Sequence, residues 1–253
     1  NIEGVEATNY DDTIFGTDGA NSLDGRFGNN IIDGRDGFDF IEYNGSGRYN
    51  LQADLTTGFA SFTKGPDGTS FTDSLVNIEG VIGSSNDDTI IGDERNNKLY
   101  GKHGNDILEG GPGDDTLDGG SGDDTLDGGA GDDTITGGAG NDTINDGRGD
   151  DIIDAGDGID TYYRDFDKTN PEENWIPHID LLREGLFSPS FGDDELMGDV
   201  LKNFENVELK GSLHSIITGN DADNFLSTDK GDDTITGGAG DDTLDGGAGN
   251  DTL

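Results

Sequence analysis

Aliphatic residues recur at every ninth position through the middle of the chain, and each is flanked mainly by polar residues. The series is Leu108, Leu117, Leu126, Ile135, Ile144 and Ile153, with Tyr162 at the next step. A single apolar residue between two polar ones is the alternation of a short β-strand that turns one side chain inward. Because one such residue cannot bury itself, we expect many units to stack around one shared core.

Glycine and aspartate complete a nine-residue repeat between these strands. Seven copies run without interruption from Gly101 to Tyr163, beginning GKHGNDILE and GGPGDDTLD. Glycine holds the fourth position in Gly104, Gly113, Gly122, Gly131, Gly140, Gly149 and Gly158. Aspartate holds the sixth position in Asp106, Asp115, Asp124, Asp133, Asp142, Asp151 and Asp160. Since glycine tolerates the positive φ angles of tight turns, each copy is predicted to be a turn followed by a three-residue strand.

The period also predicts how the copies are arranged in space. Two successive repeats on opposite sides form one flattened coil, and coils stack at about 4.8 Å, the spacing of strands in a sheet. Repeats n and n+2 then lie directly above one another. The sequence therefore predicts an all-β fold, a parallel β-roll or β-helix solenoid of stacked nonapeptide half-turns with two inserted β-hairpin-like excursions.

Two further blocks of the repeat flank the central one. The first, Ala7 to Glu42, has Asn at two of its sixth positions, and the third, Lys210 to Leu253, begins with degenerate copies. The motif NIEGV at residues 1–5 recurs at residues 77–81, and NFENV at residues 203–207 is a looser copy. We divide the chain into five parts: a first repeat block (1–42), an insert with its re-entry segment (43–82), a central β-roll (83–163), a second insert with its re-entry segment (164–209) and a truncated third block (210–253).

Two inserts interrupt the period. In the first, alternating aromatic and polar residues around the turn Thr56-Thr57-Gly58 predict a β-hairpin that leaves the solenoid and returns to it. Both inserts end on the pattern D-x-L-x-N-φ-E-x-V, in which φ is apolar, at Asp73 to Val81 and at Asp199 to Val207. The shared pattern indicates that both inserts re-enter the solenoid in the same way.

Charge changes this picture, because the chain carries 56 acidic residues against 14 Lys and Arg, a formal net charge of −42. With an apolar content of only 29%, this composition predicts disorder unless counter-ions neutralise the acids. The acidity argues against binding to nucleic acid or anionic lipid. The chain has no cysteine and no apolar run long enough to span a membrane. It begins inside a motif and stops at the eighth position of a repeat, so we expect a piece of a longer array.

The sixth-position carboxylates predict metal sites between coils. Those of repeats n and n+2 would repel each other, and a divalent ion between them removes the repulsion. Oxygen ligands without His or Cys favour Ca²⁺ over Zn²⁺ or Cu²⁺, and a flexible carbonyl-lined loop disfavours Mg²⁺. If every site filled, about ten ions would cancel about half of the charge. The candidate ligands are Asp12, Asp39, Asp88, Asp106, Asp115, Asp124, Asp133, Asp142, Asp151, Asp160, Asp233, Asp242 and Asp251.

Other polar positions of the repeat are expected to contribute less. Asn21 and Asn30 keep an oxygen ligand at the sixth position but lose the charge, so sites in the first block should be weaker. The fifth-position acids, such as Asp114, Asp123 and Asp132, are interpreted as solvated charge.

The repeat G-G-x-G-x-D-x-U-x, in which U is a large aliphatic residue, resembles the calcium-binding nonapeptide of the RTX family, the hemolysin-type repeats. The resemblance implies that glycine carbonyls complete the Ca²⁺ shell. It also implies type I secretion, which exports unfolded chains. Extracellular calcium modules bind at about 10⁻⁴ to 10⁻³ M, so such sites would be empty in a bacterial cytosol and filled outside. We therefore expect a calcium-binding structural module of a larger secreted or cell-surface bacterial protein, which folds when Ca²⁺ binds outside the cell.

The main alternative is the C-terminal repeat region of a secreted RTX enzyme, a protease, lipase or alginate epimerase. The region would then aid secretion, folding or polysaccharide binding. Neither H-E-x-x-H nor G-x-S-x-G occurs, so we expect no enzyme in this fragment and place any catalytic part outside it. Besides calcium ions, the expected partners are extracellular polysaccharide or neighbouring domains of the same protein.

Two further hypotheses have weaker support. Trp175, His178 and Asp180 lie close together in the second insert, where they could bind a sugar or perform acid–base chemistry, but they could equally be strand residues that cover the roll. Ice binding would require a regular T-x-T ladder. Here Thr134-x-Thr136 and Thr234-x-Thr236 stand isolated among T-x-D triplets, which argues against it.

Overall fold

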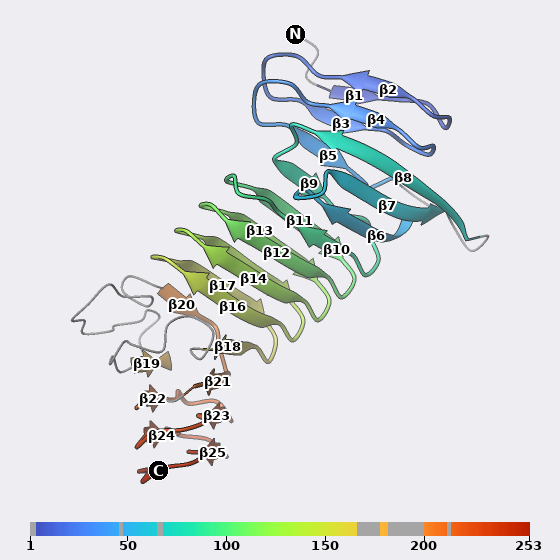
Figure 1. The fold of residues 1–253 in the computed structure, drawn as a ribbon. Coiled ribbons are helices and arrows are strands. Elements are labelled where there is room, and N and C mark those ends of the chain that lie inside the picture. The colour runs from blue at the N-terminus through green and yellow to red at the C-terminus, as the bar shows by residue number, and fades with distance from the viewer. Residues whose placement is uncertain (1–3, 46–47, 65–67, 166–177, 182–199, 212–213) are drawn as a thin grey trace.

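The computed structural model describes residues 4–45, 48–64, 68–165, 178–181, 200–211 and 214–253, and the elements in these ranges are β-strands (Figure 1). Sheet A contains, in spatial order, β1 (Gly4–Glu6), β3 (Ser22–Asp24), β5 (Phe40–Glu42), β9 (Gly80–Ile82), β11 (Lys98–His103), β13 (Thr116–Ser121), β15 (Thr134–Ala139), β17 (Ile152–Asp157) and β20 (Val200–Lys202). Sheet B contains β2 (Thr13–Phe15), β4 (Ile31–Asp33), β8 (Thr69–Val76), β7 (Phe59–Lys64), β6 (Arg48–Asp54), β10 (Thr89–Ile91), β12 (Ile107–Pro112), β14 (Thr125–Ala130), β16 (Thr143–Arg148), β18 (Thr161–Asp165), β21 (Asn206–Lys210), β23 (Phe225–Ser227) and β25 (Thr243–Asp245). Sheet C contains β19 (His178–Asp180), β22 (Ile216–Thr218) and β24 (Thr234–Thr236).

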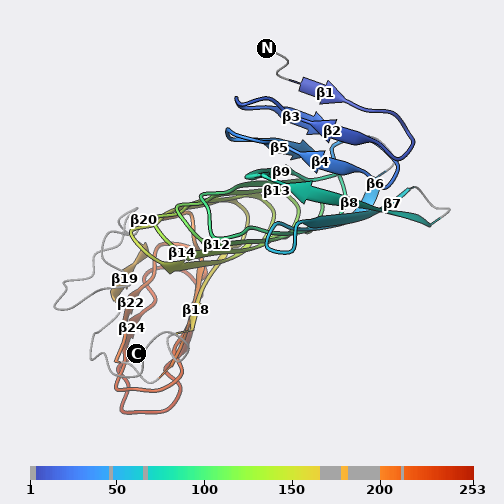
Figure 2. The ribbon, with the colours of Figure 1, turned by 45° about the horizontal axis from the view of Figure 1, so that its top comes forward.

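Successive repeats alternate between two facing sheets, which confirms the predicted parallel solenoid. In sheet A, Leu99 lies opposite Leu117, and in sheet B, Leu108 lies opposite Leu126, both in parallel register. Each coil is therefore built from two repeats, as the period requires. Figure 2 shows the central coils stacked on one another and the last coils continuing in a different direction.

The core is one line of aliphatic side chains from each sheet. The eighth-position residues Leu108, Leu117 and Ile144 are at most 1% exposed. The seventh- and ninth-position residues of the same strands are half-buried or exposed, as a strand with one inward face requires. Because each coil contributes only two such aliphatic residues, hydrophobic burial is small relative to the length of backbone that it must order.

The strands of the central coils are longer than predicted. β13 and β15 have six residues each, and their ladder continues through the paired glycines Gly120 and Gly138. Both glycines have positive φ, 103° and 117°. A Cβ on Gly138 would overlap the carbonyl of Gly120. Glycine therefore lets the backbone of one coil pass close to the next, so the ladder runs into the turn.

The first insert forms the predicted hairpin, β6–β7, but it stays within the solenoid. β7 also pairs antiparallel with β8, and the two outer strands run parallel to their solenoid neighbours, β8 to β4 and β6 to β10. Three antiparallel strands restore the original chain direction, so the meander continues sheet B instead of leaving it. The outer strands pair with the solenoid over three residues each, Gln52–Asp54 of β6 and Ser74–Val76 of β8.

The first insert adds aromatic and aliphatic side chains to the core of the roll. Phe62 is 1% exposed, and its ring centroid lies 5.3 Å from that of Tyr43 and 5.7 Å from that of Phe71. Leu51 and Ala60 are buried in the same cluster. This part of the chain is therefore held by apolar packing more than the repeats are.

The second insert lies mostly outside the described residues. Trp175, part of the suggested sugar or acid–base site, is among residues 166–177, so that hypothesis stays untested. The described strands β19 and β20 pair in parallel with β22 and β17.

Candidate metal centre

Within each repeat block, the sixth-position residues form two rows, one at each edge of the roll. In each predicted pair, the backbone N–H of the first residue donates to the side-chain Oδ1 of the residue one coil later. The N···O distance is 2.7 Å from Asp106 to Asp124, and 2.9 Å from Asp124 to Asp142. In the central block, row 1 contains Asn97, Asp115, Asp133 and Asp151. Row 2 contains Asp88, Asp106, Asp124, Asp142 and Asp160.

In eight sixth-position aspartates, the second carboxylate oxygen is buried without a hydrogen-bond donor in the described part of the chain. The residues concerned are Asp39, Asp106, Asp115, Asp124, Asp133, Asp142, Asp160 and Asp233. A buried acceptor without a partner is costly, and a charged one more so. A whole row of such oxygens indicates that something other than a protein group completes them.

Backbone carbonyls face the same spaces. A Cβ added to Gly119, at the first position of its repeat, would overlap Oδ2 of Asp124 and lie 2.8 Å from the carbonyl oxygen of Gly137. The same holds at Gly110, where the neighbours are Oδ2 of Asp115 and the carbonyl of Gly128. Carboxylate and carbonyl oxygens from successive coils thus converge where glycine leaves room. This all-oxygen donor set fits Ca²⁺.

The carboxylates are spread along the rows instead of being gathered in one cage. Within the described ranges, no three His, Cys, Asp or Glu side chains form a metal-binding cluster. Each place in a row offers its own carboxylate and the carbonyl of the next coil. Each candidate site therefore combines oxygens from different coils, which only a correctly stacked roll brings together.

Burial changes the acidity of these carboxyl groups. Desolvation, and to a lesser extent the neighbouring carboxylates, raises the pKa of Asp106 to about 7 and that of Asp133 to about 8. Desolvation also raises the pKa of Asp115 to about 6. A roll without cations therefore carries charges that its interior disfavours at neutral pH.

Asparagine at the sixth position donates a hydrogen bond from its side-chain amide, where aspartate has a carboxylate oxygen without a donor. The side chain of Asn97 donates to the carbonyl of Glu79 at 3.2 Å and accepts from the backbone N–H of Asp93 at 2.7 Å. Asn224 donates to the carbonyl of Glu205 at 2.8 Å. An amide N–H thus reaches the carbonyl of a neighbouring coil, which agrees with weaker metal binding at these positions.

The fifth-position residues have a structural role that the sequence interpretation missed. The backbone N–H of Asn141 donates to Oδ1 of Asp123 at 2.8 Å, and that of Asp123 donates to Oδ1 of Asn105 at 3.0 Å. These exposed side chains pair with a backbone donor of the next coil. The signal was available, because Asp and Asn alternate there and both supply an acceptor oxygen.

The re-entry motif supplies acids to the rows at both junctions. The backbone N–H of Asp39 donates to Oε2 of Glu79 at 3.0 Å, and that of Asp160 donates to Oε2 of Glu205, also at 3.0 Å. Asp73 plays the same part for Asn30, at 2.9 Å. Both inserts therefore re-enter through an acid two residues before an apolar core residue, the spacing of D-x-U in the repeat.

The predicted ligands near chain ends and junctions have different surroundings. Oδ2 of Asp12 accepts from the backbone N–H of Thr8 at 2.9 Å, and the Asp88 carboxylate accepts from Ser84 and from the backbone of Leu51. Asp242 and Asp251 accept from the preceding coil as predicted, both at 3.0 Å, but they are partly exposed.

A family model confirms what these rows indicate. The model of the RTX calcium-binding nonapeptide repeat matches residues 6–41, 82–117, 103–135, 127–162 and 218–253, more than half of the chain. The chain belongs to the RTX calcium-binding repeat family. It is thus a calcium-binding β-roll module, with a structural and not a catalytic role for its repeats. A comparison with curated proteins found no significant match. Among the residues that the structure describes, no helix is long and apolar enough to cross a membrane.

Proposed function

We propose that this RTX module is a calcium-gated structural segment of a larger secreted or cell-surface bacterial protein. The repeat coils stay unfolded and self-repelling where Ca²⁺ is scarce. It folds into a rigid roll where Ca²⁺ is abundant, outside the cell. Metal binding and folding are then one event, because the unfolded chain has no preformed site.

One observation carries the proposal most directly. In Asp106, Asp115, Asp124, Asp133 and Asp142, the second carboxylate oxygen is buried, has no hydrogen-bond donor among the described residues, and faces a carbonyl of the next coil. Such an arrangement is unfavourable without a cation and suits Ca²⁺ with one. The proposed ligands are therefore best supported at Asp106, Asp115, Asp124, Asp133 and Asp142. The weaker sites are proposed at Asp12, Asp39, Asp88, Asp160, Asp233, Asp242 and Asp251.

The charge and the thin core explain why the switch should be steep. The net charge of −42 opposes compaction, and two aliphatic residues per coil cannot overcome it. Each ion removes repulsion within a row and joins two coils. Since coils contact only their neighbours, filling one site helps order the next.

Circular dichroism of the chain during a Ca²⁺ titration tests the proposal, with Mg²⁺ as the matched ion and a chelator as the reference. We expect the β signal to rise cooperatively at about 10⁻⁴ to 10⁻³ M Ca²⁺ and not with Mg²⁺. Equilibrium dialysis on the same sample would count the ions. A β signal that chelator leaves unchanged would overturn the proposal.

The repeat region of a secreted enzyme would use the same calcium switch. We also propose that the chain is divided at 1–42, 43–82, 83–163, 164–209 and 210–253.

A further inference from the structure

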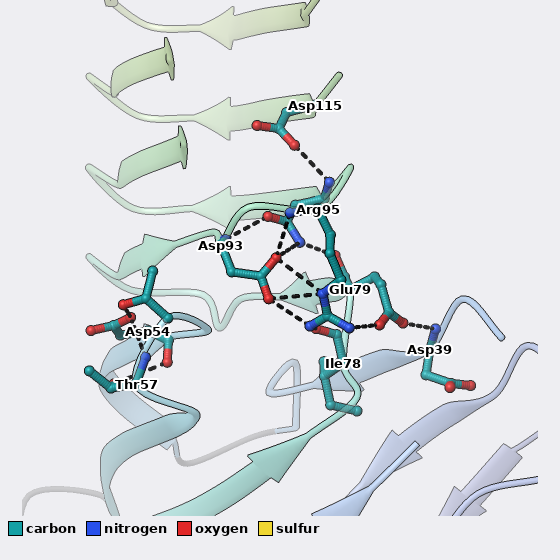
Figure 3. A network of polar contacts seen from close by, with 10 residues as sticks. Asp39, Asp54, Thr57, Ile78, Glu79, Asp93, Arg95 and Asp115 are labelled. Carbon is teal, nitrogen blue, oxygen red and sulfur yellow. Dashed lines mark hydrogen bonds and ion pairs between the residues drawn. The ribbon is translucent and has the colours of Figure 1, made fainter. Parts of the chain in front are cut away.

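An arginine stands at one end of row 1, where the first insert rejoins the roll. Arg95 holds the fourth position of its repeat, the place of glycine in the seven central copies. Its side chain reaches across the junction to the re-entry segment, between Asp93 of its own coil and Glu79 of the neighbouring one (Figure 3). A cation is therefore built into the chain at the start of this row.

Arg95 contacts carboxylate and backbone carbonyl oxygens, the same kinds of oxygen that line the candidate Ca²⁺ sites. Its Nε donates to both carboxylate oxygens of Asp93, at 3.2 and 3.0 Å, and its Nη2 donates to Oδ2 of Asp93 at 2.6 Å. Nη2 also donates to the carbonyl of Ile78 at 2.9 Å, and Nη1 pairs with Oε1 of Glu79. Two carboxylates and a carbonyl from two coils thus converge on one guanidinium group.

The next residue of row 1 fits this arrangement. Asn97 follows in place of an aspartate, and its amide binds the carbonyl of Glu79. In the first coil of row 1, the acceptor oxygens therefore receive hydrogen bonds from protein N–H groups. The carboxylates of Asp115 and Asp133, further along, have an oxygen without such a donor among the described residues.

A second arginine lies at the other end of the central part of row 1. Arg164, on β18, is 1% exposed, and its Nη1 pairs with Oδ1 of Asp146. The hydroxyl of Tyr162 donates to Oδ2 of Asp146 at 2.7 Å. The carboxylate of Asp146 is thus fully enclosed by a cation and a hydroxyl donor.

Asp146 stands at the first position of its repeat, where glycine lines the candidate Ca²⁺ sites in other copies. It is the first residue of the repeat that contains Asp151, just as Gly128 is the first residue of the repeat that contains Asp133. Its carbonyl still faces the space beside Asp133, and its side chain is bound by Arg164 and Tyr162. The charges of both Asp146 and Arg164 act on the Asp151 carboxylate.

We propose that Arg95 and Arg164 are internal substitutes for Ca²⁺ at the two ends of the central part of row 1. The junctions with the two inserts then stay ordered without calcium, and calcium dependence in this row is confined to the coils of Asp115 and Asp133. Each arginine-held junction acts as a template on which the next coil folds when Ca²⁺ arrives. The inference rests on the proposed calcium switch.

Hydrogen exchange of the full chain in chelator tests this inference, with Arg95→Met and Arg164→Met as the variants. In the unsubstituted chain, peptides covering residues 78–99 and 144–162 should exchange more slowly than those covering 116–135. Each variant should speed exchange at its own junction by about tenfold or more, the effect of losing a charge-assisted hydrogen bond. Arg95→Lys, which keeps the charge, should retain part of the protection.

Lys102→Met is the matched control, because it removes one positive charge at an exposed position of a central repeat, outside both junctions. It should leave both junctions unchanged. If Arg95→Met and Arg164→Met exchange like Lys102→Met in chelator, the inference is wrong. The first insert, residues 59–76, reports whether a variant has lost its fold altogether.

A paired variant gives a second readout that does not depend on apo stability. Asp146→Gly with Arg164→Met restores the glycine beside Asp151 and removes the internal cation, so equilibrium dialysis should find one more bound Ca²⁺ per chain. An unchanged ion count would contradict the inference. Failure of the calcium switch itself would look different, because Ca²⁺ would then not protect residues 116–135 even in the unsubstituted chain.

Discussion

Replacing Asp124 with asparagine removes one buried charge from the middle of row 2 and keeps the size of the side chain. The carboxylate is 2% exposed, its Oδ1 accepts from Asp106, and its Oδ2 has no donor among the described residues. Asparagine already occupies the equivalent place at Asn97, so the roll can accommodate it. The effect of this substitution on the stability of the roll should have opposite signs with and without calcium.

Without calcium, the substitution should stabilise the roll. Desolvation raises the pKa of Asp124 to about 6 from 3.8. A raised folded-state pKa gives stability that is complete below the unfolded value and is lost as pH rises through about 6. At pH 7 the ionised group therefore costs the folded state about 3 kcal/mol, which the asparagine variant avoids.

With calcium, the same substitution should destabilise the roll. The ion loses a charged ligand, and the attraction between unit charges about 4 Å apart near a protein surface is about 4 kcal/mol, or roughly a thousandfold in affinity. The calcium midpoint of the coils around β14 and β16 should rise accordingly. The variant should also bind one ion fewer.

Urea unfolding of the variant and the unsubstituted chain, with chelator and with saturating Ca²⁺, measures both effects. Trimethylamine N-oxide can be added to the chelator samples to favour the compact state. Asp123→Asn is the control, because it makes the same change next door at an exposed residue whose oxygen acceptor asparagine retains. It should stay within about 0.5 kcal/mol in both conditions. If Asp124→Asn behaves like Asp123→Asn, or destabilises equally in chelator and calcium, the reasoning is refuted.

Three further predictions follow from the same rows and from the first insert. Lowering the pH from about 8 to about 6 should weaken calcium binding, because Asp133 and Asp106, with pKa values of about 8 and about 7, must lose protons to bind the ion. Over the same pH interval the calcium-free roll should become more stable. Calcium titrations followed by circular dichroism at each pH would check both signs. Gly128→Ala keeps an ordinary φ but places a Cβ against the carbonyl oxygen of Asp146 and Oδ2 of Asp133, and it should abolish one site. Gly19→Ala, where a Cβ meets nothing within 4 Å, should leave the ion count unchanged in dialysis. Phe62→Ala should destabilise the first insert by about 3–5 kcal/mol equally in chelator and calcium, as measured by hydrogen exchange of residues 59–76, and a calcium-dependent loss would contradict an apolar core there.

The solenoid and its rows could be predicted because they follow from the repeat period alone. Once the period is nine, Asp106 must stack on Asp124, and Leu108 on Leu126. Asp-to-Asn changes in the first block predicted weaker sites, and the amide contacts of asparagines such as Asn97 supply the physical reason.

The junctions could not be predicted in the same way. The splice of β6–β8 into sheet B depends on pairing between residues far apart in sequence, such as Ile32 with Leu75, which no local pattern specifies. Glu79 and Glu205 carried a usable signal, since each stands two residues before an apolar core position. The re-entry motif, however, does not follow the nine-residue period from which the rows were predicted. The roles of Arg95 and Arg164 depend on where the inserts rejoin the roll, and that is set by tertiary structure.

Segment-resolved hydrogen exchange of the whole chain, with saturating Ca²⁺ and with chelator, tests the central claim most directly. The account predicts that residues 116–145, which contain the central aspartates of both rows, are protected only when Ca²⁺ is present. It predicts that residues 59–76 of the first insert are protected in both conditions. Equal protection of residues 116–145 in chelator and in calcium would contradict the claim that cations between the coils hold this roll together.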